Sequence, residues 1–583
     1  SAENQGLAAV MMSKLTRKSY RNTNTLNYNF KKLLPENHHL NFLLGQENSY
    51  TYEEELKNTL HGFPDGFTFS DAVKLTTQGK PYSIDNQLKP DDKLISFFGR
   101  VNYDFQSKYL VSATFRADGS SRFARGNRWG YFPSVSAAWR ISSEPFMEPV
   151  GDWLDDLKIR ANYGTTGNNK IPSGQMVQTY SSSTTSWVNG YDSYWAPSKT
   201  MANPDLKWET MVTRSLGLDF SVLNGRLNGI IDLYLNNSKD LLIQFPTPGT
   251  GYDNQYRNMG KTENKGLELT LNWVALDKKN YGLNFSGNIG FNKGKILSLG
   301  QMESGSFASG WASTDINNDY IIALGGVVGQ ILGYKSAGRY EVSDFSGYDE
   351  KSGKWILKEG VVNGEPVIGT LRPGSMKLLD LSDDNVVSED YKDRTVIGDA
   401  NPLHTGGFSV NGRLYGLDLS ANFNWSYGND IYNANKVEYT STGKFHSRNM
   451  IDIMAEGSRW NNLLPDGAIC NDPAMLEEMN RTTTMWSPYM KKFVMSDWAI
   501  EDGSFLRLNT LTLGYTLPQT LTKKAWLSSC RLYITGYNLV CWTNYSGFDP
   551  EVSTIRKTAL TPGVDYSAYP KSRSFIVGLN LTF

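Results

Sequence analysis

The chain has 583 residues, yet it lacks long apolar runs and has little cysteine or histidine. No stretch approaches the ~20 consecutive apolar residues that a membrane helix needs, so helical membrane spans are excluded. The three cysteines, Cys470, Cys530 and Cys541, are too few for a disulfide framework. The five histidines include no HExxH pair, and no GxSxG motif is present, so we find no hydrolase signature. Net charge is −1, which gives no electrostatic reason to expect nucleic acid as a partner.

Glycine and aromatic residues are abundant instead. The chain has 54 Gly, 32 Tyr, 26 Phe and 15 Trp, and aromatic residues make up 13% of it. Hydrophobic residues nevertheless reach only 39%, and the mean hydropathy is −0.44. This combination is typical of strands that are apolar on alternate residues only.

The last ten residues alternate in this way. Apolar Phe575, Val577, Leu579, Leu581 and Phe583 are interleaved with Ser574, Ile576, Gly578, Asn580 and Thr582. A period of two predicts a strand with one apolar face and one mainly small or polar face. The alternative is an ordinary edge strand of a soluble sandwich. The same pattern recurs upstream, for example in Val101, Tyr103 and Phe105 and again in Leu417, Leu419, Ala421, Phe423 and Trp425.

The connections between these strands alternate between short and long. We expect short or moderate connections near 34–37, 106–108, 142–156, 223–226, 277–280, 416 and 517–528. We expect long ones near 54–94, 166–212, 238–264, 293–404, 428–504 and 542–571. A transmembrane barrel has short periplasmic turns and long extracellular loops, whereas a soluble sandwich has no reason to collect its long loops at one end. The sequence therefore predicts an all-β fold, a transmembrane antiparallel β-barrel of about fifteen strands.

Strand parity adds an expectation about the start of the chain. If the last strand runs toward the periplasm, the first of fifteen strands, beginning near Tyr20, runs the same way. Residues 1–19 would then be an extracellular loop segment, and residues 20–583 would be the C-terminal part of a larger barrel. We therefore expect the export signal on a part that precedes Ser1, and the first strands either on that part or on a separate polypeptide.

Several long motifs carry a family resemblance. They are FGRVNYDFQSKYLVSATFRADGSSRF (98–123), RWGYFPSVSAAWRISSEPFM (128–147), NPDLKWET (203–210), GKTENKGLELTLNW (260–273), SFLRLNTLTLGYTLP (504–518) and YITGYNLVCWTNYSGFDPEV (533–552). Taken in order, they resemble the SusC/RagA-type TonB-dependent outer-membrane transporters. The resemblance implies 22 strands, of which this chain holds about fifteen, and a plug and TonB box on an N-terminal segment absent from this chain. It also implies a SusD-like surface lipoprotein and the TonB complex as partners, an oligosaccharide or oligopeptide as substrate, and contact with membrane lipid and lipopolysaccharide.

An acidic segment at 380–393 resembles the calcium loop of many relatives. Closely spaced oxygen ligands suit Ca²⁺, and the candidate ligands are Asp380, Ser382, Asp384 and Asp390. Ser382 and Asn385 depart from the usual Asn and Gly of that loop. The alternative is a solvated acidic loop without metal.

The long loops are rich in aromatic residues. Tyrosine and tryptophan rings stack on sugars and on peptide side chains and dominate binding energetics. The candidate substrate-binding residues are Trp187, Tyr191, Trp195, Trp311, Trp460 and Trp486. For each ring taken singly, packing of the loops against one another is the competing interpretation.

These features favour import of an oligomeric nutrient, a glycan or peptide, across the outer membrane of a Gram-negative bacterium. A passive adhesin or binding scaffold on a barrel is the alternative. An outer-membrane enzyme is a third hypothesis, but we find no catalytic set in the loops.

Overall fold

The computed structural model describes residues 8–84, 87–88, 91–172, 174–184, 193–312, 316–443, 448–490, 492–554 and 558–583. The chain forms two compact units. Unit 1 comprises Ser1–Asp219 and Tyr234–Glu263, and unit 2 comprises Phe220–Leu233 and Asn264–Phe583.

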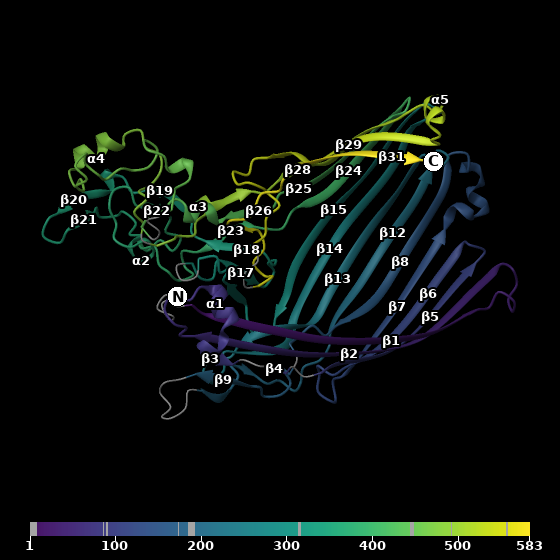
Figure 1. Cartoon of the computed structure of the whole chain (residues 1–583), viewed down its shortest axis with the longest axis horizontal. Helices are drawn as coiled ribbons and strands as arrows, with labels where there is room; N and C mark the ends of the chain where they lie inside the picture. The colour runs from purple at the N-terminus through teal and green to yellow at the C-terminus, as the bar shows by residue number, and fades with distance from the viewer. Residues whose placement is uncertain are drawn as a thin grey trace. The chain divides into compact units, whose positions relative to one another are not determined.

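Long antiparallel strands dominate both units (Figure 1). Fifteen of the described strands have nine or more residues, in agreement with the sequence. They are β1 (Val10–Asn29), β2 (His38–His61), β5 (Asp92–Phe105), β6 (Tyr109–Ser120), β7 (Trp129–Arg140), β8 (Leu154–Asn168), β12 (Glu209–Val222), β13 (Leu227–Pro246), β14 (Asn254–Asp277), β15 (Tyr281–Leu299), β24 (His404–Leu414), β25 (Leu417–Tyr427), β28 (Phe505–Thr516), β29 (Ser529–Thr543) and β31 (Ser574–Thr582).

Each long strand pairs with its neighbours in the chain. In unit 1, β1 pairs with β2, β2 with β5, and β5 through β8 follow in order. In unit 2, β15, β24, β25, β28, β29 and β31 pair in the same consecutive manner. A run of antiparallel neighbours is what alternating sequence joined by tight turns produces.

The short connections lie where the sequence predicts them. The β24–β25 hairpin turns through Tyr415 and Gly416, whose φ angles are 47° and 90°. Two consecutive positive φ values are typical of the two-residue turn whose twist matches the flanking strands, and glycine adopts them without steric cost. The other predicted turns near 34–37, 106–108, 223–226 and 277–280 also separate consecutive long strands.

Two sequence expectations require correction. The first strand begins at Val10 and pairs without interruption from Val10 opposite Leu60 to Asn29 opposite Asn41, so residues 10–19 are strand. The expected long loop at 238–264 is mostly strand as well, because β13 continues to Pro246 and β14 starts at Asn254. Both segments are rich in polar residues, so alternation of apolar residues does not predict the part of a strand that extends beyond the apolar band.

The remaining elements are short and lie mainly in the long connections. The strands are β3 (Lys80–Ile84), β4 (Gln87–Leu88), β9 (Tyr180–Thr184), β10 (Ser193–Pro197), β11 (Thr200–Met201), β16 (Ser304–Phe307), β17 (Tyr320–Ala323), β18 (Gln330–Gly333), β19 (Ser336–Arg339), β20 (Phe345–Asp349), β21 (Lys354–Leu357), β22 (Met376–Leu378), β23 (Thr395–Asp399), β26 (Asp430–Asn433), β27 (Ile500–Asp502) and β30 (Val564–Asp565). The helices are α1 (Phe69–Lys74), α2 (Glu365–Ile368), α3 (Ala434–Glu438), α4 (Pro473–Asn480) and α5 (Gln519–Thr522). Within the described ranges, none of the helices is both long and apolar enough to cross a membrane.

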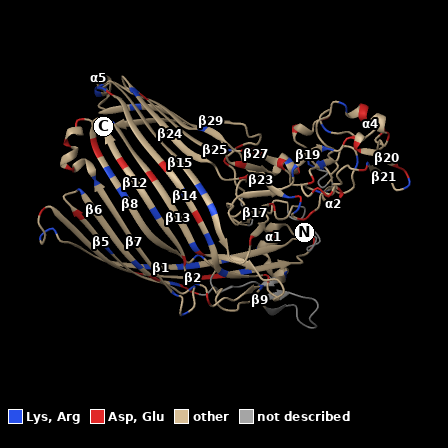
Figure 2. Ribbon diagram, turned by 180° about the vertical axis from the view of Figure 1, so that it is seen from behind, with Lys and Arg blue, Asp and Glu red and all other residues tan. Residues whose placement is uncertain are grey.

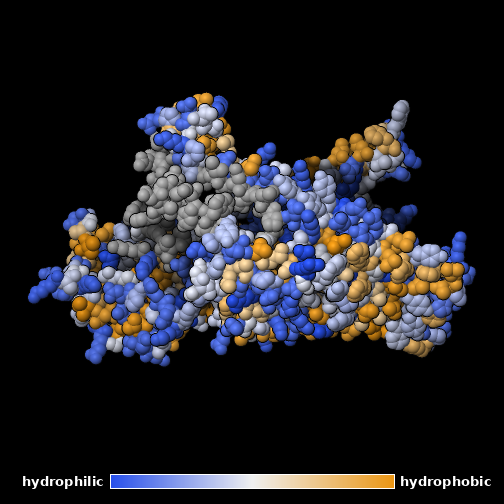
Figure 3. All heavy atoms as spheres, turned by 90° about the horizontal axis from the view of Figure 1, so that it is seen from below, coloured by the Kyte–Doolittle hydropathy of each residue, from blue (hydrophilic) through white to orange (hydrophobic). Residues whose placement is uncertain are grey.

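The long strands have two chemically different faces. In unit 1, one face carries Phe97, Phe115 and Val135, and we call this apolar side the outer face. The opposite inner face carries Arg116, which donates to Asp118 at 2.8 Å. Charged residues recur at intervals along the strands in Figure 2, and hydrophobic and hydrophilic residues are mixed on the surface seen in Figure 3. Period-two alternation places the apolar and the polar residues of each strand on opposite faces.

The long connections of unit 2 fold into a packed body. Residues of 334–378 and 454–494 share one hydrophobic core, in which Tyr340, Met454 and Leu476 are almost fully buried. A second core unites Tyr320, Ile331 and Tyr432. In Figure 1 the segments that carry β19–β22 and α4 lie together. The two longest connections therefore stabilise each other instead of forming separate flexible loops.

Candidate functional site

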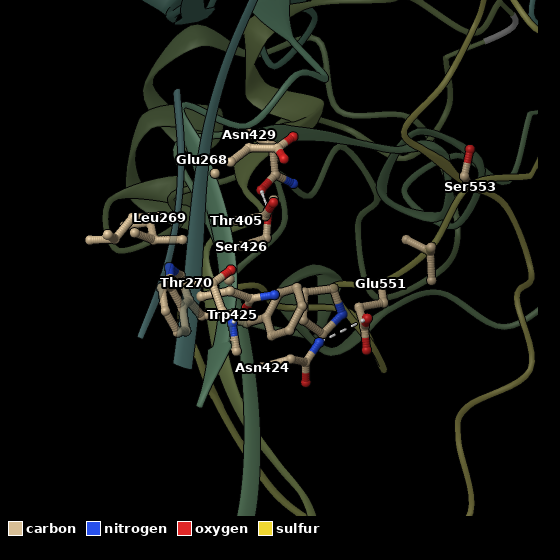
Figure 4. A pocket seen from close by; sticks show the side chains of 18 residues that line it. Glu268, Leu269, Thr270, Thr405, Asn424, Trp425, Ser426, Asn429, Glu551 and Ser553 are labelled. Atoms are coloured by element: carbon tan, nitrogen blue, oxygen red, sulfur yellow. Dashed lines mark hydrogen bonds between the residues drawn. The ribbon is translucent and has the colours of Figure 1, made fainter. Parts of the chain in front are cut away.

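A polar hollow of about 840 Å³ lies on the inner face of unit 2 (Figure 4). Neighbouring strands β14, β15, β24 and β25 form one wall, and residues 550–553 lie opposite. Alternation decides which side chains reach it. The inward set is polar, whereas Leu283, Val410 and Leu419 belong to the apolar outer set. The polar lining residues are Glu268, Thr270, Asn288, Thr405, Asn424, Ser426, Asn429, Glu551 and Ser553.

A buried ion pair fixes the loop that faces this wall. Arg507 Nη2 on β28 lies 2.7 Å from Asp549 Oδ1, and the two side chains are 4% and 7% exposed. Arg507 also forms an ion pair with Glu551, which accepts a 3.4 Å hydrogen bond from Asn424 Nδ2. Lys571 pairs with Glu551 as well. Charge-assisted contacts of this kind hold residues 549–553 against the strand wall.

This hollow can bind molecules through many neutral hydrogen bonds. Its amides and hydroxyls both donate and accept, and its two carboxylates accept only. Such a lining suits a hydroxyl-rich or peptide-like molecule, because both present alternating donors and acceptors. The sequence pattern alone does not mark these residues as a site. Asp549 and Glu551 lie in the family-like motif GFDPEV, and that motif was the available signal.

The acidic segment at 380–393 is organised around Asp393, which is fully buried. Asp393 Oδ1 accepts hydrogen bonds from the backbone N–H groups of Leu381 and Ser382, and Oδ2 accepts from the N–H and hydroxyl of Ser388. Desolvation acts to raise the pKa of Asp393, but these hydrogen bonds together hold it well below its ordinary value. Asp393 is thus the central residue of the loop, although it was not among the candidate ligands.

The four candidate calcium ligands are used within the loop. Asp380 accepts from the backbone N–H groups of Ser382 and Asn385, Asp384 accepts from Val386, and Asp390 accepts from Ser388 and Lys392. Over the described part of the chain, no group of three or more His, Cys, Asp or Glu side chains is arranged to hold a metal ion. In this structure the carboxylates of Asp380, Asp384 and Asp390 accept hydrogen bonds from within the loop. Calcium binding stays a prediction from the resemblance alone.

Three of the candidate aromatic residues are buried. Trp311 donates from Nε1 to the hydroxyl of Tyr432 at 2.6 Å, and only 5% of it is exposed. Trp460 is 2% exposed and lies under the Arg339 guanidinium, 4.6 Å from the ring centroid. Trp486 packs edge-on against Trp498. The expectation that these three rings bind substrate is corrected, because they fill the loop cores and offer no free face.

The other three candidates are not decided by the structure. Trp187 and Tyr191 lie outside the described residues. Trp195 is in β10, opposite Ser182 of β9, but its side chain is not described.

Comparisons with known proteins agree with this architecture. Residues 4–382 match the family described as TonB dependent receptor-like, beta-barrel. The chain is 29% identical to TonB-dependent receptor P3 of Formosa agariphila over 97% of this chain and 53% of that protein. It is 29% identical to TonB-dependent receptor SusC of Bacteroides thetaiotaomicron over 84% of this chain and 44% of that protein. The chain thus spans about half the length of these relatives.

A solved structure is also similar. The RagAB peptide transporter matches 99% of this chain and 56% of its own chain, with a TM-score of 0.73 and 26% sequence identity. The RagAB importer in its open-open state matches with a TM-score of 0.71 and 25% identity. The similarity thus extends across nearly the whole chain.

Proposed function

Because the chain belongs to the TonB dependent receptor-like β-barrel family and is an outer-membrane β-barrel protein, we propose that the whole protein imports an oligomeric nutrient. The substrate is a glycan or a peptide, and the energy comes from the TonB complex through the N-terminal plug segment. A SusD-like surface lipoprotein is the proposed extracellular partner. The similarity to SusC and to the RagAB peptide transporter supports this proposal.

The polar hollow on the inner face of unit 2 is the structural observation that best supports this proposal. A barrel that only displays an adhesin needs no dense set of hydrogen-bonding groups on its inner wall. Here Asn288, Thr405 and Asn424 come from three successive strands, and Glu551 faces them. Such a wall can accommodate a polar oligomer, or plug residues that move with it, through exchangeable hydrogen bonds.

The loop aromatics have a smaller part in this proposal. Trp187, Tyr191 and Trp195 remain proposed stacking residues, whereas Trp311, Trp460 and Trp486 act indirectly by holding the loop body in shape. Loss of one of those three rings is therefore expected to disturb folding of the loop body before it disturbs binding.

A matched pair of variants tests the hollow. Asn424→Leu removes an inner hydrogen-bonding group, whereas Phe423→Leu changes the adjacent residue on the outer face. In a strain without the chromosomal gene, uptake of labelled mixed oligosaccharides or mixed oligopeptides is measured for each variant. We expect Asn424→Leu to slow uptake by about tenfold, equivalent to ~1.4 kcal/mol, and Phe423→Leu to leave uptake unchanged. Equal uptake by both would contradict the role of the hollow.

A further inference from the structure

Two adjoining hollows lie on the outer face of unit 1. The first, of about 630 Å³, is framed on this face by Leu26, Leu44, Phe97 and Phe115, with Gly99 and Ala117 at its base. The second, of about 460 Å³, shares Gly99 and Phe115 and continues past Ala113 and Pro133. Small residues at the base and large apolar residues at the sides make a continuous groove on a face that contacts the membrane.

The groove is on the membrane side and not on the inner wall. A Cβ added to Gly99 would meet Leu44 Cδ2 at 3.4 Å, so Gly99 and Leu44 share a face. The opposite face of the same strands carries Glu47, which is 6% exposed and paired with Arg21 at 2.7 Å. Because charged side chains face the inside of such barrels, the groove faces lipid.

Polar residues interrupt the apolar face at one end of the groove. Residues of β1 and β2 that face outward form cross-strand pairs. Counted away from the short turn at 30–37, these pairs are Tyr28 with Phe42, Leu26 with Leu44, Asn24 with Gln46, Asn22 with Asn48, and Tyr20 with Tyr50. The short turns are periplasmic, so the four amides lie in the extracellular half of the band, just below a tyrosine pair.

These amides are only partly satisfied by the protein. Asn24 Nδ2 donates to Asn22 Oδ1 at 2.7 Å and to Gln46 Oε1 at 3.3 Å. The side-chain donors of Asn22, Gln46 and Asn48 have no protein acceptor among the described residues. Unsatisfied donors are costly at membrane depth, so these groups favour an occupant that brings carbonyl or hydroxyl oxygens.

Basic residues follow above the amides on the same outer face. Lys93 lies 5.5 Å from the Tyr50 ring centroid, and Lys18 stands opposite Tyr52. The carboxylates at this level are Asp91, 3.3 Å from Lys93, and Glu54, while Lys14 lies further along β1. Among the described residues, two lysines and two carboxylates lie at this level, and Lys14 adds a third cation further along β1, so ammonium groups are available to contact a phosphate.

We propose that this groove is a binding site for the phosphorylated, acylated glycolipid of the outer leaflet. One acyl chain occupies the two hollows, its ester or amide linkage accepts hydrogen bonds from the amides of Asn22, Asn24, Gln46 and Asn48, and its phosphate lies near Lys18 and Lys93. From the periplasmic side outward, the groove offers apolar side chains, then amides, then lysines. The lipid presents its acyl chain, its ester or amide linkage and its phosphate in the same order. The proposal depends on the membrane placement of unit 1 and is independent of the transported substrate.

Gly99→Phe is the direct test. The added ring meets only Leu44 Cδ2 at 3.4 Å and the Leu43 carbonyl oxygen at 3.7 Å near its Cβ, so it enters the hollow without backbone conflict. Gly412→Phe is the matched control, because its Cβ also faces outward, 4.0 Å from Leu283 Cδ1, and lies outside the groove. The intact protein is extracted from outer membranes in mild detergent, and native mass spectrometry counts the retained lipid.

We expect the wild type and Gly412→Phe to retain the phosphorylated glycolipid, and Gly99→Phe to retain about tenfold less. The double variant Asn24→Leu/Gln46→Leu, which leaves the inner wall untouched, should lose the lipid to a similar extent even if Gly99→Phe assembles poorly. Lys18→Gln/Lys93→Gln should lower retention several-fold. Equal retention by all variants, retention of phospholipid alone, or a self-association that Gly99→Phe abolishes would each overturn the proposal.

Discussion

Which face of the last strand points to lipid can be tested by placing a charge at either of two adjacent residues, Leu579 or Asn580. Leu579 lies near the middle of β31, is 54% exposed on the outer face, and pairs with Leu532 of β29. An arginine at the midplane of the lipid face of such a barrel costs roughly 2–4 kcal/mol. Leu579→Arg should therefore lower the fraction of assembled barrel by more than about tenfold wherever stability limits assembly.

The neighbouring residue has a different environment. Asn580 is directly opposite Arg531, whose Nε lies 2.9 Å from Asp418 Oδ1 on the polar inner face. Asn580→Arg would place two cations opposite each other, which costs about 0.2–1 kcal/mol. Asn580→Glu removes even this repulsion, because the new carboxylate meets Arg531. The expected order of stability is therefore Asn580→Glu, then Asn580→Arg, then Leu579→Arg.

Outer-membrane yield and the temperature at which the folded band shifts on a gel measure this order. A difference between Leu579→Arg and Asn580→Arg requires that neighbouring residues face lipid and lumen in turn. In a soluble sheet whose two faces are both tolerant or both buried, the two variants would have the same stability. Equal yields for Leu579→Arg and Asn580→Arg would refute the assigned facing, and with it the definition of the outer face in unit 2.

Three further predictions concern the loops. Arg507→Met should lower stability by ~3–5 kcal/mol because it leaves Asp549 buried and unpaired, and Arg507→Met/Asp549→Asn should recover part of that loss in the same heat-shift assay. Asp393→Ala should increase tryptic cleavage within 380–393, because at least three hydrogen-bond donors of the loop lose their acceptor at about 1–3 kcal/mol each. Because the pKa of Asp393 is lowered in the folded loop, its carboxylate stabilises the loop fully above the ordinary Asp pKa, and this stabilisation is lost as the pH falls below that range. Calcium titration in the same cleavage assay tests the metal predicted from the resemblance, because bound Ca²⁺ should protect 380–393 from cleavage, and cleavage unchanged by Ca²⁺ would contradict that prediction.

Local patterns in the sequence predicted the strands and short turns, because period-two alternation and turn residues act between neighbours. The β24–β25 turn at 415–416 is an example. The loop body could not be predicted in the same way. Trp460 is buried by Arg339, more than a hundred residues away, and no local signal distinguishes a packed ring from a ring that binds substrate. Asp393 was missed for a related reason, since its importance comes from donors at 381–388 that fold back onto it.

The shared core also changes how the loops should be probed. The segments 293–404 and 428–504 are the longest expected connections and are rich in aromatic residues, so we predict that they supply most partner and substrate contacts. Deletion of 428–504 would remove Met454, Trp460 and Leu476 from the core that Tyr340 and Leu378 complete. A deletion therefore tests folding of the loop body, whereas single exposed substitutions test its contacts.

The central claim, energised import, is tested most directly by uptake with and without TonB. Labelled oligosaccharide and oligopeptide mixtures are supplied to cells that carry the intact protein, and accumulation in the periplasm is measured separately from binding at the surface. The account predicts accumulation of one mixture that is abolished when TonB is deleted while surface binding persists. Surface binding with no accumulation in either strain, or accumulation that is unchanged without TonB, would contradict it.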